Sequence, residues 1–177
     1  MRVIAGEARG RRLEALPGTD VTRPTLSQVK EAMFSIVQFD LPGARVLDLY
    51  AGSGQLGIEA LSRGAESAVF VERRKDALQA VRENLEACGF SDRARLVNGD
   101  AMSYLKSGEK FDLIFLDPPY ASGLLEQALE DIARFDICRR HGIIVAESAA
   151  DKTLPPLSSP YSIYREYRYG KIKLTVY

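Results

Sequence analysis

The chain has 177 residues, a formal net charge of zero and 46% apolar residues. This length suits one domain, and the apolar fraction, with only 14 Gly and 8 Pro, excludes a disordered or collagen-like chain. No apolar run reaches the roughly 18 residues that a membrane span needs, and the first residues lack the apolar segment of a signal peptide. Cys88 and Cys138 lack the spacing of a zinc site or a disulfide framework, so we expect a reduced, cytoplasmic protein without a metal.

The neutral total hides an uneven distribution of charge. Residues 1–30 carry six Lys/Arg against three Asp/Glu, residues 151–177 carry five against two, and the segment between them carries 13 against 19. Such an asymmetry indicates basic flaps around an acidic body. The same numbers arise by chance in short segments, so charge alone identifies no partner.

The first 40 residues predict an extension in front of the main domain. Short stretches at 2–4 and 11–13, on either side of Gly6 and Gly10, predict a small β-hairpin. A helix then follows, with Thr25 as its N-cap and Gln28 completing a capping box. Its apolar face has helical spacing and consists of Val29, Ala32, Met33, Ile36 and Val37.

The rest of the chain alternates short apolar strands with amphipathic helices. The pattern predicts strands at 45–50, 67–72, 95–97, 111–116 and 142–147, and helices at 55–63, 75–88, 101–106 and 124–135. Gly89 stops one of these helices as a C-terminal cap. This alternation predicts an α/β fold with a doubly wound, mostly parallel sheet. Segments 162–168 and 171–177, which turn at Tyr169-Gly170, predict an antiparallel hairpin at the end of the chain.

The turn after the first of these strands carries a glycine pattern. Residues 48–57 read Asp-Leu-Tyr-Ala-Gly-Ser-Gly-Gln-Leu-Gly, which is a G-x-G-x-x-G turn between a strand and a helix. Its glycines let the backbone turn tightly and approach a ligand closely. This motif suits NAD as well as S-adenosylmethionine. Asp48 favours the second, because a carboxylate at the strand end attracts a cationic ligand and repels a pyrophosphate.

Acidic side chains also follow the next two strands. Glu72 ends its strand where a carboxylate suits ribose hydroxyls, although a strand-end Glu is often only solvated. Asp100 comes just after a strand, where it suits an adenine amine, with the backbone N–H of Ala101 donating to the ring. Asp100 also suits the N-cap of the next helix, and the two roles are compatible.

The fourth strand ends in Asp-Pro-Pro-Tyr at 117–120. The two prolines hold the chain rigid just past a buried strand. We expect this rigidity to aim the Asp117 carboxylate and the Pro118 carbonyl at one point. Two converging acceptors are what a planar NH₂ group needs if its lone pair is to point at an electrophilic methyl group. Tyr120 offers a ring on which a base stacks, worth roughly 1–3 kcal/mol.

With these motifs the chain resembles the class I S-adenosylmethionine-dependent methyltransferases that act on amines through an (Asp/Asn)-Pro-Pro-(Tyr/Phe) motif. Within that group it resembles the RsmD family, which methylates N2 of a guanine in 16S ribosomal RNA. The resemblance covers nearly the whole chain and is carried by residues 2–6, 9–13, 22–25, 29–34, 48–57, 117–120 and 169–170. The chain departs from the family at Glu7-Ala8, where an aromatic residue is common.

The resemblance implies a Rossmann-like, seven-stranded methyltransferase fold. It implies an RNA-facing extension at 1–40 and an S-adenosylmethionine-dependent methyltransferase domain at 41–177. We expect the partner to be 16S rRNA in an assembling small ribosomal subunit, with no membrane and no obligate protein partner. The cofactor contacts expected are Asp48, Tyr50, Gly52, Ser53, Gly54, Glu72, Asp100, Ala101 and Asp117. The catalytic residues expected are Asp117, Pro118, Pro119 and Tyr120.

Contacts to RNA are expected mainly from the basic N-terminal residues. These are Arg2, Arg9, Arg11 and Arg12, for phosphate groups. Arg23 suits either the cofactor carboxylate or an RNA phosphate, and Thr25 is grouped with it as a substrate contact, although Pro24-Thr25 equally serves only to start a helix. Tyr120 would stack on a flipped base.

Four other functions share part of this pattern. A DNA adenine-N6 or a protein-glutamine methyltransferase shares residues 117–120 but usually adds a recognition domain, for which 177 residues leave little room. An NAD-linked oxidoreductase shares only the glycine turn. A non-catalytic nucleotide-binding module would not need Asp-Pro-Pro-Tyr.

Overall fold

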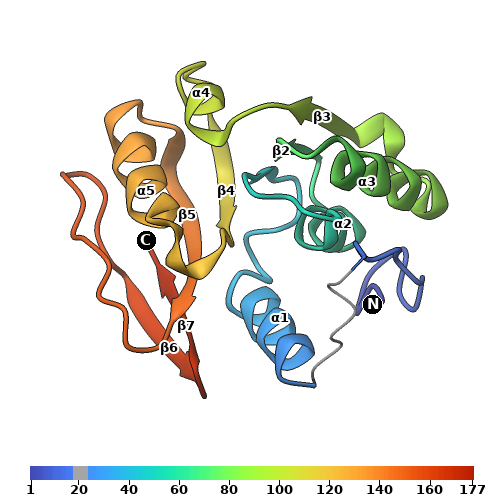
Figure 1. The fold of residues 1–177 in the computed structure, drawn as a ribbon, viewed down its shortest axis with the longest axis horizontal. Coiled ribbons are helices and arrows are strands. Elements are labelled where there is room, and N and C mark those ends of the chain that lie inside the picture. The colour runs from blue at the N-terminus through green and yellow to red at the C-terminus, as the bar shows by residue number, and fades with distance from the viewer. Residues whose placement is uncertain (18–23) are drawn as a thin grey trace.

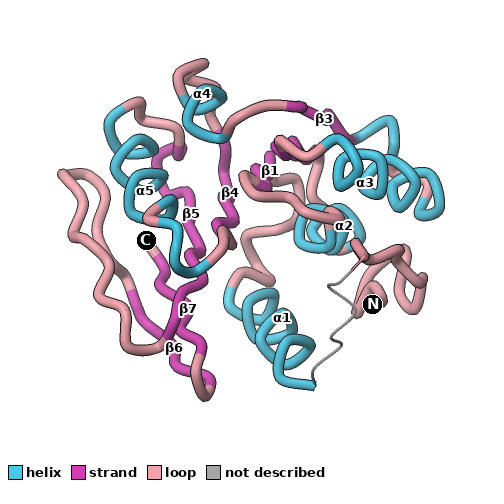
Figure 2. The backbone as a smooth tube through the Cα atoms, in the orientation of Figure 1, coloured by secondary structure: helices cyan, strands magenta, loops and turns pink. Residues whose placement is uncertain are grey.

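A computed structural model of the chain describes residues 1–17 and 24–177. Within these residues, seven strands form one sheet in the order β3-β2-β1-β4-β5-β7-β6 (Figures 1 and 2). The strands are β1 Arg45–Asp48, β2 Ser67–Glu72, β3 Ala94–Asn98, β4 Phe111–Leu116, β5 Cys138–Ala149, β6 Arg165–Tyr169 and β7 Ile172–Val176. The α-helices are α1 Pro24–Ile36, α2 Gln55–Ser62, α3 Lys75–Cys88, α4 Ala101–Leu105 and α5 Leu124–Arg134.

The pairing of the strands confirms the predicted fold class. Strands β1 to β5 pair in parallel, and β7 pairs antiparallel with both β5 and β6. Gly170 makes the tight turn between β6 and β7 with a φ of 59°, a left-handed conformation that glycine adopts without steric cost. The expected C-terminal cap is confirmed too, because Gly89 ends α3 in the left-handed region.

Strand β5 is longer than the sequence predicts. Cys138 already pairs with Phe111, and the register then shifts before Ile143 pairs with Leu113. The residues in between, Arg139 to His141, are polar and exposed. An irregularity of this kind interrupts the apolar pattern that marks a buried strand. The predicted strand therefore begins at 142 and leaves out residues 138–141, which open β5.

Side chains that alternate along the strands explain the two layers of helices. Val46, Phe70 and Phe115 lie in one core cluster with the apolar sides of α1, α2 and α3. Their neighbours Leu47 and Ile114 lie in a second cluster with α4 and α5. Because successive strand residues point to opposite faces, a sheet covered on both faces needs continuous apolar strands.

The N-terminal segment packs on the first helical layer through buried polar groups. Glu59, on α2, is 0% exposed and accepts hydrogen bonds from the N–H groups of Ile4 and Ala5 at 2.9–3.2 Å. It also forms ion pairs with Lys30 of α1 at 3.1 Å and with Arg63 at 2.9 Å. One carboxylate thus joins the segment to two helices.

One expectation for this region is confirmed and one is revised. The predicted hairpin forms as a short antiparallel pairing around the Arg2–Arg12 bridge, where Val3 donates to Arg11 at 3.0 Å and Leu13 to Met1 at 2.9 Å, and further hydrogen bonds tie its turn to Ser62 of α2. The N-cap at Thr25 is wrong, because α1 begins at Pro24 and places Thr25 inside its first turn. Proline suits the first helical position, where its missing N–H would have no partner.

The strand order places a crevice where the site is expected. The order reverses between β1 and β4, and ligands of open α/β sheets bind beyond the carboxyl ends of the strands at such a switch point. Asp48 ends β1 and Asp117 follows β4, so both acids reach this edge. Among the described residues, no helix is long and apolar enough to cross a membrane.

Candidate active site

The glycine turn between β1 and α2 is built around Asp48. This carboxylate is 2% exposed, and its Oδ2 accepts a hydrogen bond from the N–H of Gly57 at 3.0 Å. Gly54 adopts a φ of 85° at the start of α2, which a side chain would strain. A Cβ on Gly57 would lie 2.3 Å from a ring carbon of Phe70, so only glycine lets α2 approach β2 this closely.

The environment of Asp48 favours a positive charge. Burial raises the pKa of this carboxyl from 3.8 to about 7; the hydrogen bond from Gly57 opposes the shift, and the nearby charge of Glu72 adds to it. Removing a carboxylate from water without a counter-charge disfavours its ionised form. A cationic ligand at this position would supply the missing charge.

Glu72 braces the glycine turn in this structure. Its Oε2 accepts from the N–H of Gly52 at 2.9 Å, and its Oε1 accepts from the N–H of Arg74 at 2.9 Å. Because a carboxylate oxygen can accept more than one hydrogen bond, both oxygens of Glu72 can still accept from the hydroxyl groups of a ligand. Sequence reasoning considered ribose or solvent for this residue and missed its bond to the turn.

The remaining predicted cofactor contacts lie around the same edge. Asp100 caps α4, since its Oδ2 accepts from the N–H of Ser103 at 2.9 Å, which confirms the expected N-cap. Ala101 is the buried first residue of that helix. Tyr50 is half-buried and its hydroxyl donates to the carbonyl of Leu124 at 3.4 Å.

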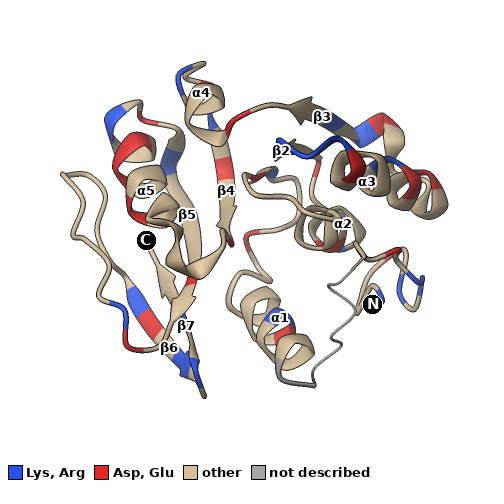
Figure 3. Ribbon diagram, in the orientation of Figure 1, with Lys and Arg blue, Asp and Glu red and all other residues tan. Residues whose placement is uncertain are grey.

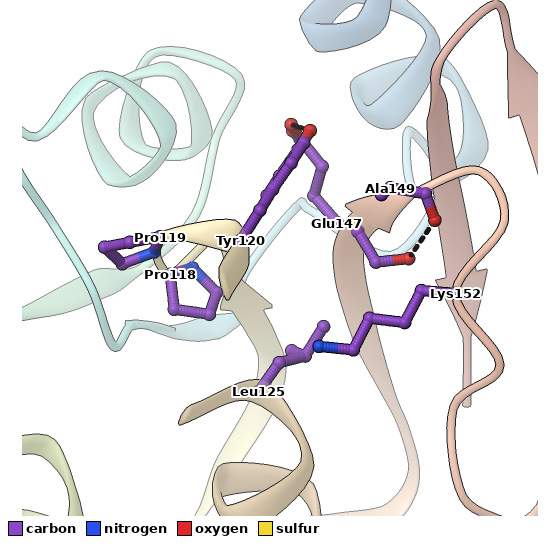
Figure 4. A pocket seen from close by; sticks show the side chains of 8 residues that line it. Pro118, Pro119, Tyr120, Leu125, Glu147, Ala149 and Lys152 are labelled. Carbon is purple, nitrogen blue, oxygen red and sulfur yellow. Dashed lines mark hydrogen bonds between the residues drawn. The ribbon is translucent and has the colours of Figure 1, made fainter. Parts of the chain in front are cut away.

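The segment after β4 forms one wall of a pocket. Pro118 is buried, Pro119 is exposed and Tyr120 is 43% exposed. The Tyr120 hydroxyl donates to Oε1 of Glu147 at 2.6 Å, across the pocket (Figure 4). The full lining is Pro118, Pro119, Tyr120, Leu125, Glu147, Ser148, Ala149 and Lys152.

Three carboxylates from three strands interact at this edge of the sheet. Burial holds the pKa of Asp117 well above its usual range, and the charges of Glu147 and then Asp48 raise it further. Burial likewise raises the pKa of Glu147, opposed by the hydrogen bond from Tyr120. The carboxylate oxygens of this centre suit a cation, or an amine that donates hydrogen bonds to them. Within residues 1–17 and 24–177, no group of His, Cys, Asp or Glu is arranged to hold a metal ion.

Two polar residues of the site were missed from the sequence. Glu147 lies near the end of a strand as Glu72 does, and this placement was the available signal. Asn84 of α3 carried no signal, although its Nδ2 donates to the carbonyls of Ser53 and Glu14 at 3.0 Å. Asn84 therefore joins the N-terminal segment to the glycine turn.

The basic N-terminal residues lie apart from this pocket. Arg9, Arg11 and Arg12 are exposed and line an open hollow that shares no residue with the pocket around Tyr120. Arg2 is exposed as well, and its guanidinium donates to the carbonyl of Gly10 at 2.8 Å, which braces the turn. Arg23 and the side chain of Thr25 lie outside the part of the chain that the structure describes.

Comparison with known proteins gives matches along the whole chain. The model of a family described as Conserved hypothetical protein 95 matches residues 1–177. YlbH of Bacillus subtilis is 40% identical over 181 residues, covering 100% of this chain and 98% of that protein. Ribosomal RNA small subunit methyltransferase D of Escherichia coli K12 is 34% identical, with 100% and 89% covered. The solved structure of yhhF from Escherichia coli matches with a TM-score of 0.89 and 33% identity, covering 100% and 96%.

Proposed function

Since this chain belongs to the RsmD family, whose model covers it from end to end, we propose that it methylates the exocyclic N2 amine of a guanine in 16S ribosomal RNA. The chain is a ribosomal RNA methyltransferase, as are the relatives that it matches over its full length. The observation that carries the proposal is the group of three carboxylates at this edge, the buried Asp48 and Glu147 and the half-buried Asp117, of which Asp117 opens the rigid Asp-Pro-Pro-Tyr segment.

The residues at the carboxyl edge of the sheet fit S-adenosylmethionine. This cofactor, when bound, supplies an electrophilic methyl group on a sulfonium and leaves as the neutral thioether. None of the described residues forms an ion pair with Asp48, which suits the cationic methionyl part. Gly52 has open space where a Cβ would lie, so its backbone is free for close approach by a ligand. Glu72 keeps acceptor capacity for ribose hydroxyls, and Asp100 with the N–H of Ala101 suits the adenine ring.

The segment at 117–120 would hold and deprotonate the target amine. The Asp117 carboxylate and the Pro118 carbonyl accept its two hydrogens, which leaves the nitrogen lone pair free to attack the methyl carbon. The raised pKa of Asp117 makes this carboxylate a competent acceptor for the proton that the amine loses as the N–C bond forms. Tyr120 provides the exposed ring on which a flipped base stacks.

The other parts of the proposal concern the RNA. We place phosphate contacts at Arg9, Arg11 and Arg12, which are exposed and have no acidic partner among the described residues. Residues 1–40 are proposed as the RNA-facing extension of a methyltransferase domain at 41–177. A partly assembled small subunit suits an enzyme with so small a recognition element.

Asp117→Ala tests the chemistry. We expect methyl transfer from labelled S-adenosylmethionine to small ribosomal subunits to fall by at least about 10³-fold, because the amine loses its orienting acceptor. Calorimetry should show S-adenosylmethionine binding retained within about tenfold of wild type. Turnover at the wild-type rate would contradict the assignment, as would binding of NAD in preference to S-adenosylmethionine by the wild-type protein.

A further inference from the structure

The pocket beside Tyr120 contains an acid to which the reaction above gives no role. Glu147 lies on β5, and its neighbour Ala146 pairs with Leu116 of β4. This register brings Glu147 level with Asp117 on the adjacent strand. The residue is 9% exposed, so its carboxylate is largely removed from water.

One oxygen of Glu147 lacks a partner. Its Oε1 accepts the hydrogen bond from Tyr120 at 2.6 Å, whereas its Oε2 accepts none within the part of the chain that the structure describes. The other polar groups that line the pocket are engaged. Lys152 pairs with Glu126 at 2.8 Å, and the Ser148 hydroxyl donates to the carbonyl of Ala149 at 3.1 Å.

We propose that Glu147 determines which base the enzyme accepts, by accepting a hydrogen bond from N1–H of the target guanine while Asp117 and Pro118 hold the adjacent N2 amine. This inference rests on the proposed function. Guanine carries its two donors, N1–H and the N2 amine, on neighbouring atoms of one edge. The two acceptors, Asp117 and Glu147, likewise lie side by side, at the ends of the neighbouring strands β4 and β5. Adenine presents a lone pair at N1, which a buried carboxylate repels.

The bond between Tyr120 and Glu147 supports this role. It holds the Glu147 carboxylate against Tyr120, the side chain on which the base stacks. A base stacked on Tyr120 would therefore have its edge at a fixed position relative to the carboxylate. A site built to hydrogen-bond an N–H group rejects an analogue without it, because the acceptor that the bound base covers is then left unpaired.

The test replaces the target guanine by 2-aminopurine. This base keeps the 2-amine but carries a lone pair at N1 and lacks the 6-oxygen. The methylated nucleotide is first mapped on wild-type product, and small subunits reconstituted with 2-aminopurine at that position are then compared with unmodified ones. We expect wild type to favour guanine by at least about 100-fold in kcat/KM.

Glu147→Gln isolates the N1 contact from the loss of the 6-oxygen. The Gln amide still accepts from Tyr120 through its oxygen, and its NH₂ group donates to the lone pair of 2-aminopurine. We therefore expect the guanine preference to fall by at least about tenfold relative to wild type. Tyr120→Phe is the matched control, since it removes the hydrogen bond from Tyr120 to Glu147 but leaves the carboxylate that faces N1, and it should slow both substrates by a similar factor.

An unchanged preference in Glu147→Gln would overturn the inference, as would an equal change of preference in Tyr120→Phe. Thermal unfolding establishes that both variants fold. If Glu147→Gln does not fold, the test is the ratio of kcat/KM for guanine to that for 2-aminopurine in wild type. A ratio below about tenfold overturns the inference. Failure of wild type to methylate unmodified subunits would instead contradict the proposed function.

Discussion

At the scale of single residues, the site depends on carboxylates that folding removes from water. Asp48, Asp117 and Glu147 each have a raised pKa with burial as the largest cause. Such groups destabilise the ligand-free fold when ionised, and the proposed cationic cofactor would relieve this cost on binding. The same carboxylates therefore strengthen the binding of the cofactor and lower the stability of the ligand-free protein.

The titration of Asp48 predicts a pH dependence of stability. Its pKa is about 7 in the folded chain against an ordinary 3.8, so the folded state keeps a proton that the unfolded state has lost between these values. The free energy of unfolding should therefore fall as pH rises through this window. The contribution of Asp48 is about 2–3 kcal/mol between pH 5 and pH 8.

Urea unfolding of the ligand-free protein at pH 5 and pH 8 checks this prediction. Asp48→Asn should lessen the fall in the free energy of unfolding by that amount, because the amide does not ionise. The exposed Asp92→Asn serves as a control and should leave the fall unchanged. A fall as steep in Asp48→Asn as in wild type would show that this carboxyl is not the group responsible.

The site residues show what sequence can and cannot predict. Asp48, Glu72 and Asp117 were found because each ends or follows an apolar strand, and strand ends of a parallel sheet share one edge. The bond from Gly52 to Glu72 spans 20 positions, and the one from Tyr120 to Glu147 spans 27. Pairings of this kind depend on register between strands, which a local pattern does not contain.

At the scale of elements, most helices and strands could be predicted from apolar strand segments and from the glycines that end helices. Strands β2 and β4 and helix α3 have the predicted bounds, since apolar runs or helical spacing end there at polar or glycine residues. The N-terminal segment was predicted less well. Its main anchor is Glu59, which the sequence pattern did not single out and which is fully buried.

Replacing this anchor should weaken the packing of residues 1–17 on α2. Glu59→Gln leaves the buried Lys30 ammonium without its counter-charge, and we expect the free energy of unfolding to fall by about 3–5 kcal/mol. Chemical denaturation measures this change. Glu86→Gln, on the exposed side of α3, is the matched control and should stay within about 0.5 kcal/mol of wild type. Equal stability of the two variants would show that Glu59 does not anchor the segment.

At the scale of the whole molecule, the net charge of zero is the sum of separated parts. The acidic residues that end or follow the strands lie at the carboxyl edge of the sheet, others are spread over α3 and α5, and exposed arginines lie on the N-terminal turn (Figure 3). This separation suits an enzyme that holds a cation in its centre and phosphates at its rim. Composition predicted the asymmetry, but only the fold places the arginines around a hollow of their own.

Neutralising that hollow should weaken RNA binding and its dependence on salt. The triple variant Arg9→Gln, Arg11→Gln and Arg12→Gln should reduce the slope of log K against log salt by about 2, because three phosphate contacts are lost. Filter binding to 16S rRNA across salt concentrations measures it. The control changes three exposed cations outside the hollow, Lys106 after α4, Arg134 of α5 and Arg140 of β5, to Gln. An equal effect of both triple variants would show a general charge effect without a local binding surface.

The identity of the methylated nucleoside tests the central claim most directly. Small ribosomal subunits isolated without this modification are incubated with the protein and labelled S-adenosylmethionine, and the rRNA is digested to nucleosides for mass spectrometry. The account predicts label in N2-methylguanosine from 16S rRNA, and none after incubation with Asp117→Ala. Label in N6-methyladenosine, or in protein in place of RNA, would contradict it.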